Sequence, residues 1–288
     1  MQVTTHAFVA MTTPCQLTLH GAPAGLARTI EAEVRRLEQR YNFHDPASWL
    51  NRVINTRQTS EVELDMETAR VLHRVRTLST WCQGAFDITV GTLAALRLVR
   101  DPEHYRQGHA ALQAAMGLDA WQLSDRQLKL PHAATRLDLG GVIKEHAVDV
   151  AVTLAKQAGV AAGIVNFGGD LRVFGQPPDS DCFTIGIENP RQPSEVLFGL
   201  TLYDQALASS GHHARRNVLG GASRSHIQPT QGDTLPGWLQ ASVIAADTLT
   251  AGLLATALLV KPLQTLPPDC AAVLVAEDLT LHPLGSTA

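Results

Sequence analysis

The stretch Leu137-Asp138-Leu139-Gly140-Gly141-Val142-Ile143-Lys144 joins an apolar segment to a helix in which apolar residues recur at spacings of three and four as far as Gly159. Two glycines directly before a helix let a ligand approach the backbone, and the free N–H groups there favour an anion. Lys144 adds a cation in the first turn, where the helix dipole does not favour one. This suggests a bound phosphate or carboxylate. The alternative is a plain strand-turn-helix junction, since the pattern is neither a P-loop nor GxGxxG.

Three more helices are predicted around this one. Leu26 to Tyr41 carries the same apolar spacing, Asp65 is an expected N-cap for a helix through Leu78, and an apolar helix runs from about Ala246 to Leu259. Helices and strands mix without a βαβα rhythm, which predicts an α+β fold. No linker stands out, so residues 1–288 are expected to form a single domain. The predicted strands are Gly163–Phe167, Phe183–Ile187, Leu197–Tyr203, Ser242–Ala245 and Ala271–Ala276.

Composition excludes several classes of function. The chain has 288 residues, 45% of them hydrophobic, and a formal net charge of -4 without clustered Lys and Arg, which argues against nucleic acid as a partner. No apolar stretch approaches the ~18 residues of a membrane span. The first residues lack the pattern of a signal peptide. Since an export signal can be removed from a protein, both the cytoplasm and the periplasm stay open. The four cysteines are too far apart to predict a zinc site or a disulfide framework.

Two further segments combine glycine with aspartate. In Gly84-Ala85-Phe86-Asp87-Ile88-Thr89-Val90-Gly91, Asp87 is expected at a helix-to-strand corner, where its carboxylate can accept hydrogen bonds from a ligand. The alternative is an aspartate that caps local backbone donors, and for this segment alone it is favoured. Asn166-Phe167-Gly168-Gly169-Asp170 predicts a tight turn after an apolar strand.

Polar residues gather in the last third of the chain. Ser209 to Arg216 and Ser225 to Gly232 hold Ser, His and Arg together. His226 is a candidate general base because an unperturbed imidazole titrates near neutrality. A solvent-exposed polar loop is the alternative. Asp247 begins an apolar helix, where an aspartate serves either as an N-cap or as an oxygen ligand for Mg²⁺.

In their order along nearly the whole chain, these segments resemble the ApbE family of FAD:protein FMN transferases. The family carries motifs of the form TDGxFDITVGPL, LDLGGIAKGYAVD, NxGGD, STSGD, HIIDPxTG and ADALATAL, after an opening MGT strand. The counterparts are Met11–Thr13, Gly84–Gly91, Leu137–Lys144 with Ala147–Asp149, Asn166–Asp170, Ser209–Gly211, Ile227–Gly232 and Ala246–Asp247 with Leu249.

The resemblance implies an α+β fold in which two lobes enclose a flavin cleft. It implies Mg²⁺-assisted transfer of FMN from FAD to a Thr or Ser hydroxyl of an acceptor flavoprotein with a DxxTGAT-like segment, with release of AMP. His226 is then the expected base, and Gly141, through its backbone, and Asp247 are the expected metal ligands. The expected FAD-binding residues are Met11, His44, Ala85, Phe86, Asp87, Asp138, Lys144 and Ile227.

The chain also departs from the motifs. Gln228 stands for the aspartate of HIIDP, and Ala251 for the threonine four residues after the metal aspartate. Glu145 and His146 replace the glycine and tyrosine after the lysine. Glu145 either crowds the pyrophosphate or provides a missing carboxylate, and the sequence leaves both open. Two alternative functions follow: a non-catalytic FAD carrier or assembly factor for a redox complex, and a weak FAD pyrophosphatase.

Overall fold

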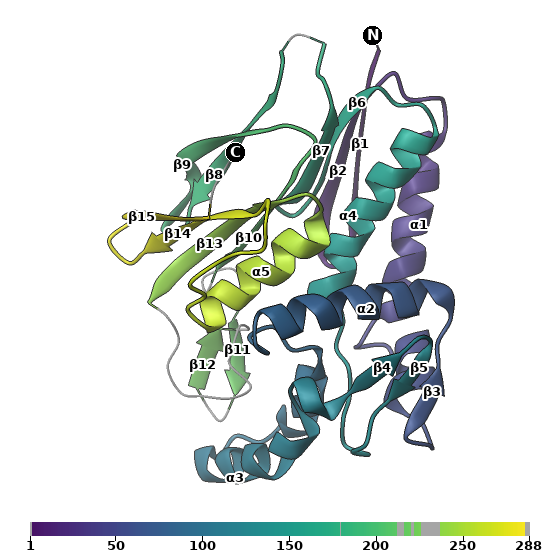
Figure 1. Cartoon of the computed structure of the whole chain (residues 1–288), viewed down its shortest axis with the longest axis vertical. Helices are drawn as coiled ribbons and strands as arrows, with labels where there is room; N and C mark the ends of the chain where they lie inside the picture. The colour runs from purple at the N-terminus through teal and green to yellow at the C-terminus, as the bar shows by residue number, and fades with distance from the viewer. Residues whose placement is uncertain (1, 179, 212–215, 220–221, 226–236, 286–288) are drawn as a thin grey trace.

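An eight-stranded antiparallel sheet forms the centre of the molecule (Figure 1). The computed structural model describes residues 2–178, 180–211, 216–219, 222–225 and 237–285. In spatial order the strands are β1 (Val3–Ala10), β2 (Thr13–His20), β6 (Ala162–Phe167), β7 (Asp170–Gly175), β10 (Ala206–Gly211), β13 (Trp238–Ala245), β14 (Ala271–Ala276) and β15 (Leu281–Gly285).

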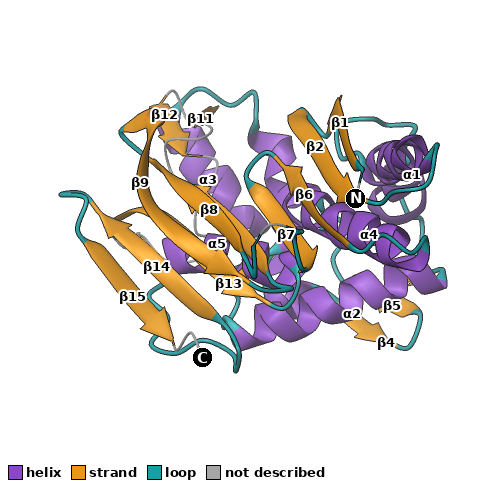
Figure 2. Cartoon of the chain, turned by 90° about the horizontal axis from the view of Figure 1, so that it is seen from above, coloured by secondary structure: helices purple, strands orange, loops and turns teal. Residues whose placement is uncertain are grey.

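The two faces of this sheet are covered differently, as Figure 2 shows from above. Helices α1 (Leu26–Tyr41), α4 (Gly140–Gln157) and α5 (Thr248–Val260) pack on one face with the larger buried cluster, to which Val165 and Phe167 of β6 belong. A ribbon of β8 (Phe183–Asn189) and β9 (Gln192–Leu202) packs with Ile164 and other residues of the opposite face. Alternate residues of one strand thus enter two cores, as a pleated sheet requires.

The segment between α1 and α4 lies below the sheet in Figure 1. It holds α2 (Met66–Trp81), α3 (Pro102–Leu112) and a small sheet of β3 (Glu61–Glu63), β5 (Gln127–Lys129) and β4 (Gln122–Ser124). The segment also contains short helices at Leu50–Asn55, Ile88–Leu96, Gln113–Ala115 and Leu118–Ala120. Elsewhere, after β10, the strand β11 (Arg216–Leu219) pairs with β12 (Ala222–Ser225). Mixed sheets and helices confirm the α+β prediction.

Two local predictions were wrong. The segment after Asp87 is a 3₁₀ helix, Ile88–Leu96, rather than a strand, because the carboxylate of Asp87 accepts a hydrogen bond from Thr89 N at 2.8 Å and starts the helix. Met11 and Thr12 form the turn between β1 and β2 instead of a strand. Both adopt left-handed φ angles, 52° and 58°, which close this tight turn.

Three of the four free cysteines, Cys15, Cys82 and Cys270, are buried. Burial raises the pKa of the Cys82 thiol to about 12, so this thiol stays protonated and unreactive at neutral pH. Within the described residues, no helix is both long and apolar enough to cross a bilayer.

Candidate functional site

The segments Gly84–Gly91 and Leu137–Lys144 meet at the beginning of α4. The backbone N–H of Asp138 donates to Ile88 O at 2.8 Å. The ring of Phe86 lies beside Gly141, where a Cβ atom would be in ordinary van der Waals contact with it at 3.5 Å. Asp138 Oδ1 accepts a hydrogen bond from Gly140 N at 2.9 Å, which fixes the turn into the helix. The structure therefore brings together two segments that the sequence placed about fifty residues apart.

Asp87 serves the local backbone. Its Oδ1 accepts hydrogen bonds from Thr89 N and Thr89 Oγ1, and its Oδ2 accepts one from Gly117 N at 3.0 Å. The preceding Ala85 is half-buried and its N–H donates to Cys82 O at 3.1 Å. The carboxylate of Asp87 thus holds the loop that shapes this end of α4, as the capping alternative proposed.

Lys144 lies in a cluster of charged groups one turn into α4. Its Nζ forms an ion pair with Asp170 Oδ2 and lies 3.3 Å from Glu145 Oε1. Asp170 begins β7, and its Oδ1 also accepts a hydrogen bond from Ser209 N on β10 at 3.2 Å. The ammonium group of Lys144 is therefore held between α4 and the sheet, and contacts with both fix its position.

The β6–β7 turn packs against the β1–β2 turn beside this cluster. Gly168 N donates to Pro14 O at 2.9 Å, and Gly168 has a φ of 65°. A Cβ atom at Gly168 would lie 2.1 Å from Thr13 Oγ1, so the contact requires glycine. In the same turn between β1 and β2, Met11 donates its N–H to the Glu38 carboxylate of α1. Met11 is therefore tied to the helix that packs beside α4.

Hydroxyl groups extend the cluster along β10 and α5. Ser209 Oγ lies 2.8 Å from Ser242 Oγ, and Ser210 Oγ lies 3.0 Å from Thr256 Oγ1. Thr256 is half-buried although nearly all of α5 is buried, so the apolar helix carries a polar group on the side facing the sheet. These hydroxyls can donate to and accept from an oxygen-rich ligand.

His44 is exposed in a loop beside the 3₁₀ helix Ile88–Leu96. Arg97 Nη1 lies 3.2 Å from His44 Nδ1, and the rings of Phe43 and His44 meet edge to face at 5.6 Å. A Cβ atom at Gly91 would lie 2.8 Å from the Phe43 ring, so the His44 loop packs on the helix that Asp87 begins. His226 and Ile227 lie outside the described residues.

Asp247 is not brought to the Lys144 cluster. It caps α5 by accepting from Thr250 N at 2.9 Å, and it pairs with Arg74 of α2 at 2.6 Å. Burial raises its pKa, but the Arg74 and Thr250 hydrogen bonds outweigh this and hold the pKa below its ordinary value. Asp247 precedes Thr256 by nine residues, which corresponds to about 13 Å along a helix.

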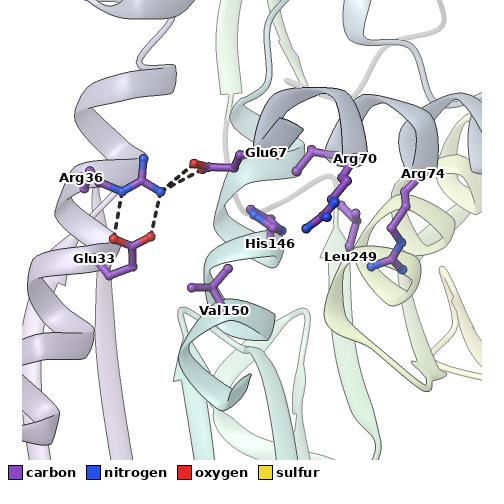
Figure 3. A pocket seen from close by; sticks show the side chains of 9 residues that line it. Glu33, Arg36, Glu67, Arg70, Arg74, His146, Val150 and Leu249 are labelled. Atoms are coloured by element: carbon purple, nitrogen blue, oxygen red, sulfur yellow. Dashed lines mark hydrogen bonds and ion pairs between the residues drawn. The ribbon is translucent and has the colours of Figure 1, made fainter. Parts of the chain in front are cut away.

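His146 lines a cavity whose lining does not include its neighbours Lys144 and Glu145. This cavity, of about 370 Å³, lies among the helices (Figure 3). His146 points into it between Arg70 and the Arg36–Glu67 pair. The residues that line it are Glu33, Arg36, Glu67, Arg70, Val71, Arg74, His146, Val150 and Leu249.

We expect His146 to make folding stability depend on pH. Burial lowers the pKa of His146 below its ordinary 6.5, and Glu67, which acts in the opposite direction, does not offset this. The unfolded chain therefore binds the proton more readily, and stability is lost as pH falls below 6.5 towards the folded-state pKa. Urea unfolding of the native chain and of His146→Gln at pH 5 to 8 measures this. The variant should lose less stability at low pH than the native chain, and equal losses in the two proteins would contradict this expectation.

Comparison with known proteins gives one family. Residues 11–269 match the model of the ApbE family. A protein of Klebsiella pneumoniae (strain 342) named FAD:protein FMN transferase is 23% identical over 96% of this chain and 88% of its own length. A protein of the same name from Rhodobacter capsulatus is 25% identical over 97% of this chain, which spans 55% of that relative.

Solved structures agree on the fold. The ApbE protein of Thermotoga maritima has a TM-score of 0.84 with 23% identity, covering 98% of this chain and 97% of its own. The flavin transferase ApbE of Vibrio cholerae has a TM-score of 0.79 with 20% identity, covering 99% and 97%.

Sequence reasoning missed Thr256, and a signal for it was present. Matching the motif ADALATAL to Ala246–Asp247 with Leu249 leaves Ala251 in place of the motif's threonine. Moved by five residues, it fits Ala251-Gly252-Leu253-Leu254-Ala255-Thr256-Ala257-Leu258 at six of eight positions. In this register the motif's threonine is Thr256 and its aspartate is replaced by Gly252, both of which lie on the side of α5 near Glu145 and Ser210.

Proposed function

Because the chain belongs to the ApbE family, we propose that it is a FAD:protein FMN transferase, which moves FMN from FAD to a Thr or Ser hydroxyl of an acceptor flavoprotein and releases AMP. One observation carries this proposal for the site itself: Lys144, held by Asp170, lies where α4, the sheet and the hydroxyls of β10 and α5 meet. A fixed cation beside hydroxyls and a glycine-rich helix start is suited to a pyrophosphate.

The proposed reaction is a phosphoryl transfer. The acceptor hydroxyl oxygen forms a bond to the FMN phosphorus, the bond from that phosphorus to the bridging oxygen breaks, and AMP leaves with the bridging oxygen. The hydroxyl proton passes to a base, for which His226 remains the candidate. Lys144 neutralises charge on the pyrophosphate, and Asp170 keeps its ammonium in place. A bound Mg²⁺ would neutralise further phosphate charge.

The FAD-contacting surface is proposed to run from Lys144 to the loops around α4. Phe86 and Asp138 lie beside Gly141, whose backbone oxygen is a proposed metal ligand. Exposed His44 would offer a ring for stacking. The remaining proposed contacts are Met11, Ala85, Asp87 and Ile227.

The test is a transfer assay with the purified chain, FAD, Mg²⁺ and an acceptor protein that carries a DxxTGAT-like segment. We expect FMN bound covalently to the acceptor, detected by mass spectrometry, with AMP released in equal amount. FAD bound without transfer would favour the carrier, and AMP released without acceptor would favour the pyrophosphatase.

Asp138→Ala and Asp87→Ala are each expected to weaken FAD binding about tenfold, or by about 1.4 kcal/mol. Asp138 Oδ1 fixes the turn at Gly140, and Asp87 holds the loop beneath Phe86, so both changes disturb the surface proposed to contact FAD. Titration of FAD, followed by its fluorescence, gives the affinity. Asp204→Ala is the control, because this exposed residue between β9 and β10 pairs with Lys156 at the far end of α4. Native affinity in both variants would remove the basis for this surface.

A further inference from the structure

Glu145 is a buried carboxylate with one oxygen unused. Only 5% of the residue is exposed. Its Oε1 lies 3.3 Å from Lys144 Nζ, but its Oε2 has no hydrogen-bond partner within the described part of the chain. A buried carboxylate oxygen without a partner is costly, which points to a ligand that binds there.

The carboxylate of Glu145 occupies space that Gly252 of α5 leaves free. A Cβ atom at Gly252 would lie 2.5 Å from Glu145 Cγ and 3.3 Å from Oε1. Any side chain at 252 would therefore begin where the Glu145 side chain now lies. A carboxylate can reach this point either from position 145 on α4 or from position 252 on α5. In this chain it comes from α4, as Glu145.

The surroundings suit a divalent cation. Lys144 is shared between Glu145 and Asp170, so one positive charge faces two buried carboxylates. Thr256 lies one turn after Gly252 on the same face of α5, and its hydroxyl meets Ser210 Oγ at 3.0 Å. Among the described residues, no three His, Cys, Asp or Glu side chains form a metal-binding group. Mg²⁺ suits such a site, because it is usually held by one or two carboxylates together with waters and substrate phosphates.

We propose that Glu145 is the carboxylate ligand of the divalent cation, supplied from α4 across Gly252, with Thr256 as a neighbouring oxygen donor. The proposal rests on the proposed function, which brings the cation and the substrate pyrophosphate to this place. It assigns Asp247 no contact with the cation, because Arg74 and Thr250 already hold that carboxylate. The competing interpretation is that Glu145 is only the ion-pair partner of Lys144.

The test measures Mn²⁺ binding to the full chain with FAD present, from the electron paramagnetic resonance signal of free Mn²⁺. Glu145→Gln keeps the packing over Gly252 and should weaken Mn²⁺ binding at least tenfold, because even residues that only support a metal's ligands commonly contribute about tenfold or more. Glu145→Gly combined with Gly252→Asp moves the carboxylate to α5 and should restore the affinity to within about threefold of native. Native Mn²⁺ affinity in Glu145→Gln would overturn the proposal, as would weakening by Asp247→Asn alone.

A second measurement uses the unaltered chain, so it does not depend on the folding of a variant. Fe²⁺ bound in place of Mg²⁺, with ascorbate and peroxide, cleaves the backbone near the metal. Cuts near 145 and near 252–256 support the proposal, and cuts near 74 and 247 refute it. Metal binding is read separately from transfer. Glu145-dependent Mn²⁺ binding without FMN transfer would therefore reject the proposed function alone, whereas FMN transfer with Mn²⁺ binding independent of Glu145 would reject this inference alone.

Discussion

Replacing Asp149 with alanine is expected to lower the free energy of unfolding by about 3–5 kcal/mol. Asp149 Oδ1 accepts hydrogen bonds from Thr248 N and from Arg172 Nη1, both at 3.0 Å, and Oδ2 accepts one from Leu249 N at 3.1 Å. The residue is 8% exposed. Alanine would leave a guanidinium and two N–H groups at the start of α5 without an acceptor, in a place that water does not reach freely.

Urea unfolding at pH 7 measures the loss. Asp204→Ala is the matched control, since it also removes an ion pair with α4, to Lys156 at 2.7 Å, but both side chains are exposed. Such a pair contributes about 0–1 kcal/mol. A loss below about 1 kcal/mol for Asp149→Ala would mean that the buried hydrogen bonds are replaced by water or by other groups.

Asp149 also sets the register between α4 and α5. It holds the first turn of α5 against the middle of α4, and one turn earlier Glu145 lies against Gly252. The aspartate in the segment that resembles LDLGGIAKGYAVD is therefore structural, although it lies in the same motif as Lys144. Its hydrogen bonds align the two helices that together build the proposed cation site.

The helices were predicted well because the spacing of their apolar residues shows which face packs on the core. Leu26–Tyr41 was predicted with the bounds that the structure shows, and Asp65 caps α2 through Thr68 N as expected. In the central sheet, the strands β1, β2, β7, β10 and β15 were missed. β10, Ala206–Gly211, has one large apolar residue and ends in Ser-Ser-Gly, which resembles a loop, and it becomes a strand through its pairing with β7 and β13.

The roles of the site residues stay predictions, but their positions can be compared. Phe86 and Asp138 lie beside Gly141, so two segments far apart in the sequence are neighbours in the fold. Asp247 lies against Arg74 and Thr250, whereas a helix of repeated Ala, Leu and Thr fits the motif ADALATAL in two registers. Glu145 and Gly252 lie on two helices that are far apart in the sequence but pack together in the fold. No local sequence pattern reveals such a contact.

Lys144→Met is expected to slow FMN transfer by about 100-fold or more, the effect of removing one fixed donor from a site that stabilises developing negative charge. The change leaves the buried carboxylates of Asp170 and Glu145 without their shared cation, so they would repel the pyrophosphate instead of attracting it. Single-turnover transfer at saturating FAD and Mg²⁺ measures the step separately from FAD affinity, and circular dichroism checks the fold.

Two matched variants decide whether the position of the Lys144 charge is what causes the slower FMN transfer. Lys156→Met removes a lysine from the exposed end of the same helix and should transfer at the native rate. Lys144→Arg keeps the charge, but the guanidinium is a larger planar fork than the ammonium that fits between Asp170 and Glu145, so partial activity is expected. If Lys144→Met retained a third of the native rate, Lys144 would be only a structural ion-pair partner. The phosphate charge would then be neutralised by the metal or by groups outside the described residues.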